Sequence, residues 1–310
     1  MGGALMTLVS VIVPMWNDSS YIIECLKSID ANDDIIGEVI VIDNASTDNS
    51  VSLVNFANIP KVKIIRNSSN VGAAKARHQA IALSSYPLIT FLDSDDILGP
   101  KAVRDAADDL VNRQLDMSIY TMLRLDMDGD THFYLPPLTE IISGNEAFGR
   151  TIGGWAIHPM GVFKREVYDK ATNNFDFHGH SDDEVITRYI FLSAAKIGGN
   201  SGVYIYRDKV REHTARQILG QALTNMRTLQ LAVQNGVAEN KLRVARSNII
   251  LNLLAIIKRG IPSMKDNLVM LGIAKDVVAL DIPWIFRDFH YRIAINLLLT
   301  FFLLRHGRHR

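Results

Sequence analysis

Residues 88–96 read Leu-Ile-Thr-Phe-Leu-Asp-Ser-Asp-Asp, an apolar run of strand length that ends in three carboxylates within four residues. Neighbouring carboxylates repel one another unless a cation lies among them, and hard oxygen ligands of this kind suit Mg²⁺ or Mn²⁺. A divalent ion held by few carboxylates completes its coordination shell with water and substrate phosphates. The stretch therefore predicts a ligand that carries a diphosphate. The alternative is a solvated turn in which Asp95 or Asp96 caps a helix.

Upstream of this stretch, strand-like and helix-like segments alternate. The expected strands are Leu8 to Val13, Glu38 to Ile42, Val62 to Arg66 and Leu88 to Leu92, and the expected helices are Ser19 to Ile29, Asp48 to Phe56 and Val71 to Leu83. This β-α-β-α-β-α-β order predicts an α/β fold with a mostly parallel, doubly wound, Rossmann-like sheet. Ligands bind such sheets outside the carboxyl ends of the strands, which favours a functional role for Asp93 to Asp96 over a simple cap.

The rest of the chain is less regular and then becomes helical. Helices are expected at Pro100 to Gln114 and Asp183 to Ala195, strands at Ser118 to Leu125, Gly129 to Tyr134 and Val203 to Arg207, and a turn at Gly198 to Gly202. From Ala215 to Arg310 the pattern is helical and basic. We therefore expect an α/β domain over residues 1–214, followed by a helical C-terminal extension over residues 215–310.

The composition excludes several classes of protein. Lys+Arg and Asp+Glu are both 33, so the formal net charge is +0 and no nucleic-acid partner is expected. Cys25 is the single cysteine, which excludes an intrachain disulfide and a cysteine-based metal site. The apolar N-terminal residues lack a preceding Lys or Arg and a following cleavage site, so a buried strand explains them better than a signal peptide.

The C-terminal tail combines an apolar run with basic residues. Ile293 to Leu304 is nearly all apolar and is followed by five basic or histidine residues. About 12 residues are too few to span a bilayer, which needs roughly 20. Aromatic residues lie just upstream, so we expect a helix in the headgroup zone and peripheral contact with a membrane. The alternative is a helix packed on the core or on a partner subunit of a homo-oligomer.

Three further segments carry candidate functional groups. Asp43 and Asn44 follow the second strand, where a carboxylate can accept hydrogen bonds from a base or ribose. The segment Asn70 to Arg77 begins a helix with small residues, and Lys75 or Arg77 could reach a phosphate. Ser181-Asp182-Asp183-Glu184 begins a helix; these carboxylates either cap it or supply a general base.

Taken together, these segments resemble the family 2 glycosyltransferases, which have the GT-A fold. The similarity is specific to about residue 100, looser to about residue 215 and absent beyond. Val9 to Asn17 resembles a strand that ends in Pro-x-Tyr-Asn, with Trp16 in place of Tyr, and Glu38 to Asp48 resembles a strand followed by Asp-Asp-Gly-Ser-Thr-Asp, with Asn44 and Ala45 substituted. Asn70 to Arg77 resembles Asn-x-Gly-x-x-x-Ala-Arg. Asp93 to Asp96 matches the Asp-x-Asp (DXD) metal motif.

The resemblance implies roles for residues on the donor side. Residues 1–100 would form the half that binds the nucleotide-sugar, and the residues expected to contact it are Pro14, Trp16, Asn17, Asp43, Asn44, Arg77, Asp93 and Ser94. The metal, Mn²⁺ or Mg²⁺, would be held by Asp95 and Asp93, with His213 as a further ligand from a closing loop at Arg207 to Thr214. The metal and Arg77 would neutralise charge on the departing diphosphate.

On the acceptor side, residues 101–214 would bind the second substrate. The Ser181-Asp182 pair resembles the family's Glu-Asp acceptor motif, with Ser181 in place of Glu. Asp182 is the expected catalytic base by spacing, and Asp183 is the alternative. Trp155 would stack on a sugar, and Glu184 would also contact the acceptor. The implied reaction is a single displacement that inverts the anomeric configuration.

The resemblance also implies a substrate class and a location. The donor would be a UDP-sugar, the transferred group a hexosyl or N-acetylhexosaminyl unit, and the acceptor a glycan. The apolar, basic tail indicates a lipid-linked glycan, as in surface polysaccharide synthesis. The protein would act in the cytoplasm at the inner face of the cell membrane. Two alternatives are a nucleotidyltransferase acting on sugar phosphates and a non-catalytic nucleotide-sugar-binding module. The first would usually have a Gly-rich, basic loop after the first strand, and residues 16–19 have neither feature.

Overall fold

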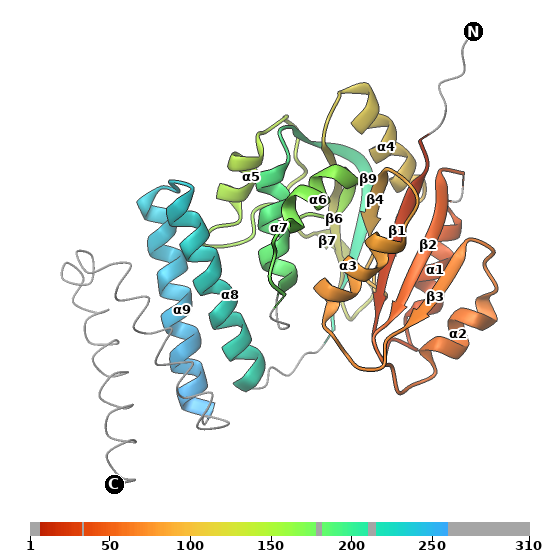
Figure 1. Cartoon of the computed structure of the whole chain (residues 1–310), viewed down its shortest axis with the longest axis horizontal. Coiled ribbons are helices and arrows are strands. Elements are labelled where there is room, and N and C mark those ends of the chain that lie inside the picture. The colour runs from red at the N-terminus through yellow and green to blue at the C-terminus, as the bar shows by residue number, and fades with distance from the viewer. Residues whose placement is uncertain (1–6, 33, 178–181, 210–214, 260–310) are drawn as a thin grey trace. The chain divides into compact units, whose positions relative to one another are not determined.

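The computed structural model describes residues 7–32, 34–177, 182–209 and 215–259 (Figure 1). The chain divides into two compact units. One consists of residues 1–151 and 155–210, and the other of residues 152–154 and 211–310. The first unit carries the β-sheet, and the described part of the second is mainly helical.

The first half of the sheet follows the predicted alternation. Its elements are β1 (Val9–Met15), α1 (Ile22–Asp30), β2 (Ile36–Asp43), α2 (Ser50–Ala57), β3 (Val62–Arg66), α3 (Ala73–Leu83) and β4 (Leu88–Phe91). These strands lie in the order β3-β2-β1-β4 and are all parallel. Met15 of β1 pairs with Asp43 of β2, and Ile12 pairs with Phe91 of β4. The carboxyl ends of these strands therefore form one edge, as the sequence predicts.

Helices cover both faces of this parallel half, which confirms the doubly wound architecture. On one face, alternate residues of β1, such as Val11 and Val13, belong to a core cluster that includes Leu26 of α1 and Val103 of α4 (Ala102–Asn112). The intervening Ile12 is equally buried but lies outside that cluster. Successive strand residues point to opposite faces, so Ile12 faces the other layer. Helix α3 lies against β1 and β2 there (Figure 1).

Beyond β4 the sheet is mixed. The remaining elements of the first unit are β5 (Ile97–Leu98), α4, β6 (Met117–Leu125), β7 (Thr131–Phe133), α5 (Gly144–Arg150), β8 (Gly161–Lys164), α6 (Arg165–Thr172), α7 (Asp182–Ser193) and β9 (Ile197–Arg207). The sheet order continues β4-β8-β6-β9-β5, with β7 paired to β6. Strand β9 runs parallel to β6 and pairs with β5 through Ile97 and Ile205. The C-terminal end of β9 is thereby brought next to the carboxylates that follow β4.

Part of this half differs from the sequence prediction. The elements α5, β8 and α6 were not expected, and the turn predicted at residues 198–202 is part of the continuous strand β9. Gly199 is required there by close packing, because a Cβ atom would lie 2.1 Å from the carbonyl oxygen of Leu138. Asn200 then donates from its side chain to Ser118 and to the carbonyl of Ile119. Gly199 and Asn200 therefore allow tight packing within strand β9 and do not reverse the chain.

The second unit contains two long helices that pack against each other, α8 (Ala215–Gln234) and α9 (Glu239–Arg259). They form the predicted helical C-terminal region as far as the described residues extend. None of the helices in the described part of the chain combines the length and apolar character needed to cross a bilayer. The predicted membrane-associating tail, Ile293 to Leu304, lies outside the described residues.

A buried glutamate joins three segments of the first unit. Glu38 in β2 is 3% exposed. It accepts hydrogen bonds from the Ser10 hydroxyl at 2.9 Å, the Ser85 backbone N–H at 2.5 Å and the Lys63 ammonium at 3.0 Å. Burial opposes ionisation, but these donors outweigh it and lower the pKa of Glu38 below its usual 4.5. The carboxylate therefore stabilises the fold while it is ionised.

We expect Glu38→Ala to lower the free energy of unfolding by about 2–3 kcal/mol, because the buried Ser10 hydroxyl and the Ser85 backbone N–H lose their acceptor. The lowered pKa means that this contribution is complete above pH 4.5 and is lost as the pH falls through the folded-state pKa. Urea unfolding at neutral pH and below pH 4 measures both effects. The control Lys63→Ala removes only the exposed partner and should cost less than about 1 kcal/mol. Equal losses in the two variants would contradict this account.

Candidate active site at the carboxyl edge of the sheet

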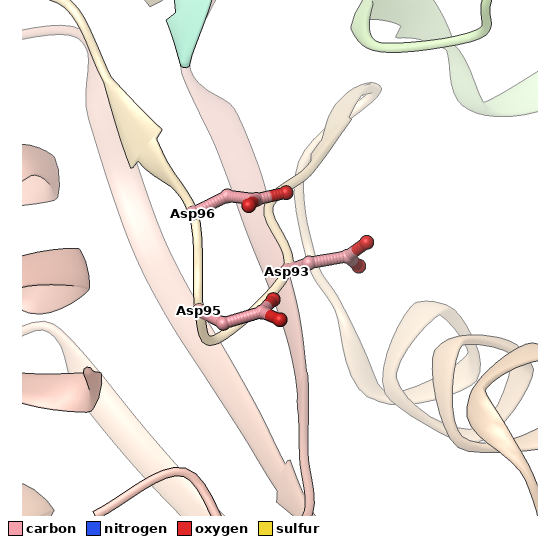
Figure 2. Close-up of side chains that lie close together, drawn as sticks. All are labelled: Asp93, Asp95 and Asp96. Atoms are coloured by element: carbon pink, nitrogen blue, oxygen red, sulfur yellow. The ribbon is translucent and has the colours of Figure 1, made fainter. Parts of the chain in front are cut away.

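Three carboxylates gather directly after β4. Asp93, Asp95 and Asp96 each offer an oxygen atom within 4.8 Å of the others. Figure 2 shows their side chains projecting toward the same side of the turn. A set of carboxylate oxygens at this spacing fits Mg²⁺ or Mn²⁺, which prefer hard oxygen ligands. The residues predicted from the sequence as metal ligands, Asp93 and Asp95, are thus close enough to share one ion, and Asp96 lies beside them.

Asp96 is the buried member of the group, and its two oxygens are already occupied. Oδ2 accepts from the Tyr204 hydroxyl at 2.7 Å, and Oδ1 accepts from the Arg207 backbone N–H at 2.9 Å. Burial, followed by the charges of Asp93 and Asp95, raises the pKa of Asp96 to about 8. The Tyr204 hydroxyl also accepts from the Asp93 backbone N–H at 3.2 Å. Asp96 and Tyr204 therefore orient the turn, and Asp93 and Asp95 are the better placed metal ligands.

Two cations bracket the carboxylates. Arg77 of α3 forms an ion pair with Asp93, and its guanidinium carbon lies 5.3 Å from the centre of the Phe91 ring. Lys209, two residues after β9, lies 2.7 Å from Asp95 and 2.8 Å from Asp18. The predicted pairing of Arg77 with the donor's charged end is therefore geometrically possible, since Arg77 already contacts a member of the carboxylate group.

The loop after β1 completes this side of the site. Ser94, which is buried, donates through its hydroxyl to Asp18 at 2.6 Å. Asn17 has a φ of 56°, a left-handed conformation that asparagine tolerates. Its side-chain oxygen accepts from the Thr47 backbone N–H at 2.8 Å. Asn17 and Ser94 therefore hold the loops after β1, β2 and β4 together, and their predicted contacts with the nucleotide-sugar stay predictions.

The predicted nucleoside residues lie at the ends of β1 and β2. Pro14 is buried in β1, whereas the Trp16 side chain is 52% exposed and available for stacking. Asp43 is fully buried, and its Oδ1 accepts from the Ser46 backbone N–H at 3.0 Å. Its Oδ2 accepts no hydrogen bond within the described chain, although Arg66 Nε lies 3.0 Å away. A buried carboxylate oxygen that has an ion pair but accepts no hydrogen bond can still accept from the N–H group of a base.

Asn44 serves the neighbouring loop instead. Its side-chain oxygen accepts from the Asn67 side chain at 3.2 Å and from the Val71 backbone N–H at 3.0 Å. Its amide nitrogen donates to Asn70 at 2.9 Å. The side chain is thus used to fix residues 67–71, which lead into α3 and Arg77. Its predicted contact with the nucleotide-sugar stays a prediction.

A cavity of about 230 Å³ begins beside the carboxylates. Its lining combines Asp93 and Arg77 with aromatic residues and two acidic residues from the start of α7. The acidic, aromatic and histidine side chains of this lining include Asp183, Glu184, Trp155, His158, Tyr134 and Tyr206. The lining of the cavity therefore combines charged groups compatible with a diphosphate and aromatic side chains, which suits a sugar between two substrates.

Trp155 is held in this cavity by a buried arginine. The Arg188 guanidinium carbon lies 4.3 Å from the centre of the Trp155 ring. Arg188 also donates to the Thr151 hydroxyl at 3.2 Å and to the Glu184 carbonyl at 2.9 Å. Because these hydrogen bonds fix Arg188, the indole that packs on it is a preformed wall of the cavity. This position agrees with the expected stacking of Trp155 on a sugar, and the contact itself stays a prediction.

The two candidate bases occupy different positions. Asp182 is 1% exposed and is not among the residues that line the cavity. Asp183 lines the cavity together with Asp93 and Arg77. A general base must reach the proton it removes, so the geometry favours Asp183 over Asp182. Ser181 and His213, which were also predicted for the site, lie outside the described residues.

Several residues of the site have no clear signal in the sequence. Asp18 follows the first strand, so the strand-end rule identifies its position but not its partner, Lys209. Tyr204 and His158 lie more than 60 residues from the carboxylates along the chain. They reach the site only through the pairing of β9 and the course of the chain before β8. A pattern search along the sequence has no means of finding such contacts.

Two proteins illustrate the sequence similarity of this chain to known enzymes. "Glycosyltransferase GlyG" from Streptococcus pneumoniae serotype 4 is 27% identical over 214 residues, which cover 64% of this chain and 70% of that protein. "Poly(ribitol-phosphate) beta-N-acetylglucosaminyltransferase TarS" from Staphylococcus aureus is 34% identical over 102 residues, which cover 32% of this chain and 18% of TarS. The match to TarS is therefore confined to a minor part of that protein.

Solved structures of S. aureus TarS share the fold. The crystal structure of its residues 1–349 in complex with UDP has a TM-score of 0.63 at 18% identity, and the match covers 87% of this chain and 80% of that chain. The complex of the same fragment with UDP-GlcNAc has a TM-score of 0.57 at 18% identity, with 95% and 80% covered. This similarity confirms the predicted fold class, an α/β fold of the GT-A type.

The family follows from the sequence itself. The family model described as glycosyl transferase family 2 matches residues 10–172, more than half of the chain. The matched segment contains the three carboxylates, Arg77 and the loops after β1 and β2. The resemblance drawn from the sequence is thereby confirmed, and the chain belongs to glycosyl transferase family 2.

Proposed function

We propose that this chain is a metal-dependent, inverting glycosyltransferase that moves a sugar from a UDP-sugar to an acceptor hydroxyl. The observation that carries the proposal is the cavity beside β4, in which Asp93 and Arg77 share one space with Asp183 and Trp155. Transfer from a nucleotide donor needs stabilisation of a leaving diphosphate and removal of a proton from the acceptor. The lining of this cavity carries groups of both kinds.

The donor would bind across the carboxyl edge of the sheet. Trp16 would stack on the uracil, and Asp43 Oδ2 would accept from the ring N–H. Crystal structures of TarS in complex with UDP and with UDP-GlcNAc support a UDP-sugar here. A hexosyl or an N-acetylhexosaminyl group would both fit this proposal.

At the diphosphate, Asp95 and Asp93 would hold Mn²⁺ or Mg²⁺ as the cofactor. When bound, a divalent ion supplies Lewis-acid stabilisation of the leaving diphosphate. Arg77, fixed by Asp93, would add a second positive charge on the same group. Asp96 would stay bound to Tyr204 and keep the turn in place.

Asp183, which lines the same cavity, would accept the proton of the acceptor hydroxyl. The attacking oxygen would approach the anomeric carbon from the side opposite the diphosphate, so the configuration would invert. Trp155 would stack on a sugar ring, and Glu184 would contact the acceptor. The aromatic side chains that line the cavity would exclude water, which would favour transfer over hydrolysis.

The acceptor is proposed to be a glycan or a lipid-linked glycan of surface polysaccharide synthesis. TarS, whose name gives poly(ribitol-phosphate) as its substrate, supports a polymeric acceptor. A location in the cytoplasm at the inner face of the cell membrane, with peripheral contact through the C-terminal tail, completes the proposal. Deleting residues 285–310 tests that contact: membrane association should be lost in fractionated cells.

A screen of nucleotide-sugars tests the proposed activity. We expect Mn²⁺-dependent release of UDP from at least one UDP-sugar, and we expect EDTA to abolish it. Chiral analysis of a transfer product should show inversion at the anomeric carbon. Release of pyrophosphate from a nucleoside triphosphate and a sugar phosphate would instead indicate a nucleotidyltransferase. Calorimetry that detects no uptake of UDP, with or without Mn²⁺, would contradict the proposal.

A further inference from the structure

A lysine contacts the carboxylate group from the segment that follows β9. The ammonium nitrogen of Lys209 lies 2.7 Å from Asp95 Oδ2 and 2.8 Å from Asp18 Oδ1. It also lies 4.2 Å from the centre of the Tyr21 ring. The side chains of Lys209 and Asp95 are only 18% and 12% exposed, so solvent screens this pair weakly. Lys209 therefore acts as a strongly held cation at a predicted metal ligand.

The contact has a supporting framework. Asp18 is held by the Ser94 hydroxyl at 2.6 Å, and its backbone N–H donates to Ser50 at 2.9 Å. Strand β9 is fixed nearby, because the Arg207 backbone N–H donates to Asp96 and its side-chain Nε donates to the Asp95 carbonyl at 3.0 Å. Hydrogen bonds therefore fix both the loop that carries Asp18 and the end of β9 that leads to Lys209, and together they place Lys209 against Asp95.

A divalent ion and this ammonium group compete for the same place. A metal bound to a carboxylate oxygen lies about 2.0–2.2 Å from it, and two cations on one oxygen repel each other. An ion arriving alone would have to displace Lys209 from Asp95 and leave it with Asp18. An ion arriving with a nucleoside diphosphate brings phosphate oxygens that can accept the displaced ammonium. The long, flexible stem of lysine allows this short movement.

We propose that Lys209 is a built-in counter-ion that a divalent metal displaces from Asp95 and that then pairs with the donor's diphosphate. This inference rests on the proposed function. The metal and the nucleotide would bind cooperatively, because the metal releases Lys209 from Asp95 to pair with the diphosphate, and the diphosphate accepts the ammonium group that the metal displaces. The exchange would keep the site from retaining a metal without its donor.

Titration calorimetry with Mn²⁺, in the absence and presence of saturating UDP, tests this exchange. We expect the full chain to bind Mn²⁺ at least about tenfold more tightly when UDP is present. In Lys209→Met, Mn²⁺ alone should bind about tenfold more tightly than to the unaltered chain, UDP should bind more weakly, and the enhancement by UDP should shrink. Circular dichroism establishes that each variant is folded.

Two further variants make the test specific. Lys63→Met removes a lysine that pairs with Glu38 at 3.0 Å, far from Asp95 along the sheet, and should leave Mn²⁺ binding unchanged. Lys209→Arg keeps the charge and should keep the enhancement by UDP. If Lys209→Met binds Mn²⁺ alone no better than the unaltered chain, or if Lys63→Met gives the same gain, the inference is wrong although the proposed function stands. If the unaltered chain takes up neither Mn²⁺ nor UDP, the proposed function fails as well.

Discussion

Replacing Asp95 by asparagine is expected to reduce strongly the Mn²⁺-dependent release of UDP from the donor. The amide keeps the shape of the side chain but removes the charge that would hold the ion. Stabilisation of a leaving group by a metal is worth several kcal/mol, and each 1.4 kcal/mol is about tenfold in rate, so kcat/KM should fall by about 10² to 10³. Donor-release assays at several Mn²⁺ concentrations measure the loss directly.

The matched control is Asp34→Asn, which removes an equal charge from an exposed carboxylate. Asp34 pairs with Arg104 at 2.6 Å and lies outside the cavity lining. It should retain full activity. Raising the Mn²⁺ concentration should partly restore Asp95→Asn if the defect lies in metal affinity. If Asp95→Asn shows the same Mn²⁺ dependence as the unaltered chain, Asp95 does not bind the metal, and the three aspartates form only a turn.

The residues at the strand ends could be predicted from the sequence because their positions obey a local rule. Leu88 to Leu92 is apolar and Asp93 to Asp96 is acidic, so one stretch of the chain defines both the strand and its functional end. Asp43 is predicted by the same rule at β2. Parallel pairing then brings these ends to one edge without further information.

The partners of those residues could not be predicted, because they depend on the mixed half of the sheet. Tyr204 reaches Asp96 only because β9 runs between β6 and β5, and nothing local in residues 197–207 specifies those neighbours. The glycines at its start favour a turn when the chain is considered alone. In the fold, Gly199 packs against the backbone of Leu138, and tertiary packing decides the conformation.

The short elements before α7 were missed for a related reason. Strand β8 has 4 residues and continues directly into α6, so neither periodicity is repeated often enough to be recognised. Strand β8 nevertheless pairs with β4 and β6 and closes the gap between the two halves of the sheet. The cavity also depends on this region, because His158 and Met160, which precede β8, form part of its lining.

Replacing Asp183 by asparagine is expected to reduce the transfer rate constant, kcat, by about 10² to 10⁴. An amide cannot accept the proton that the acceptor hydroxyl must lose as it attacks. The affinity for UDP should change little, because the expected nucleoside contacts are made by Trp16 and Asp43, which lie outside the cavity lining. Steady-state transfer assays, combined with calorimetry for UDP, separate the two quantities.

Asp182→Asn distinguishes the two candidate bases, and Asp169→Asn, an exposed carboxylate of α6, controls for the loss of charge. Because Asp182 is buried and absent from the cavity lining, its replacement should act mainly on stability, lowering the free energy of unfolding while kcat stays within about tenfold. The opposite pattern, in which Asp182→Asn loses transfer and Asp183→Asn keeps it, would restore the assignment that spacing alone favours. It would also require Asp182 to become accessible once the acceptor is bound, since a base must lie within hydrogen-bond reach of its proton.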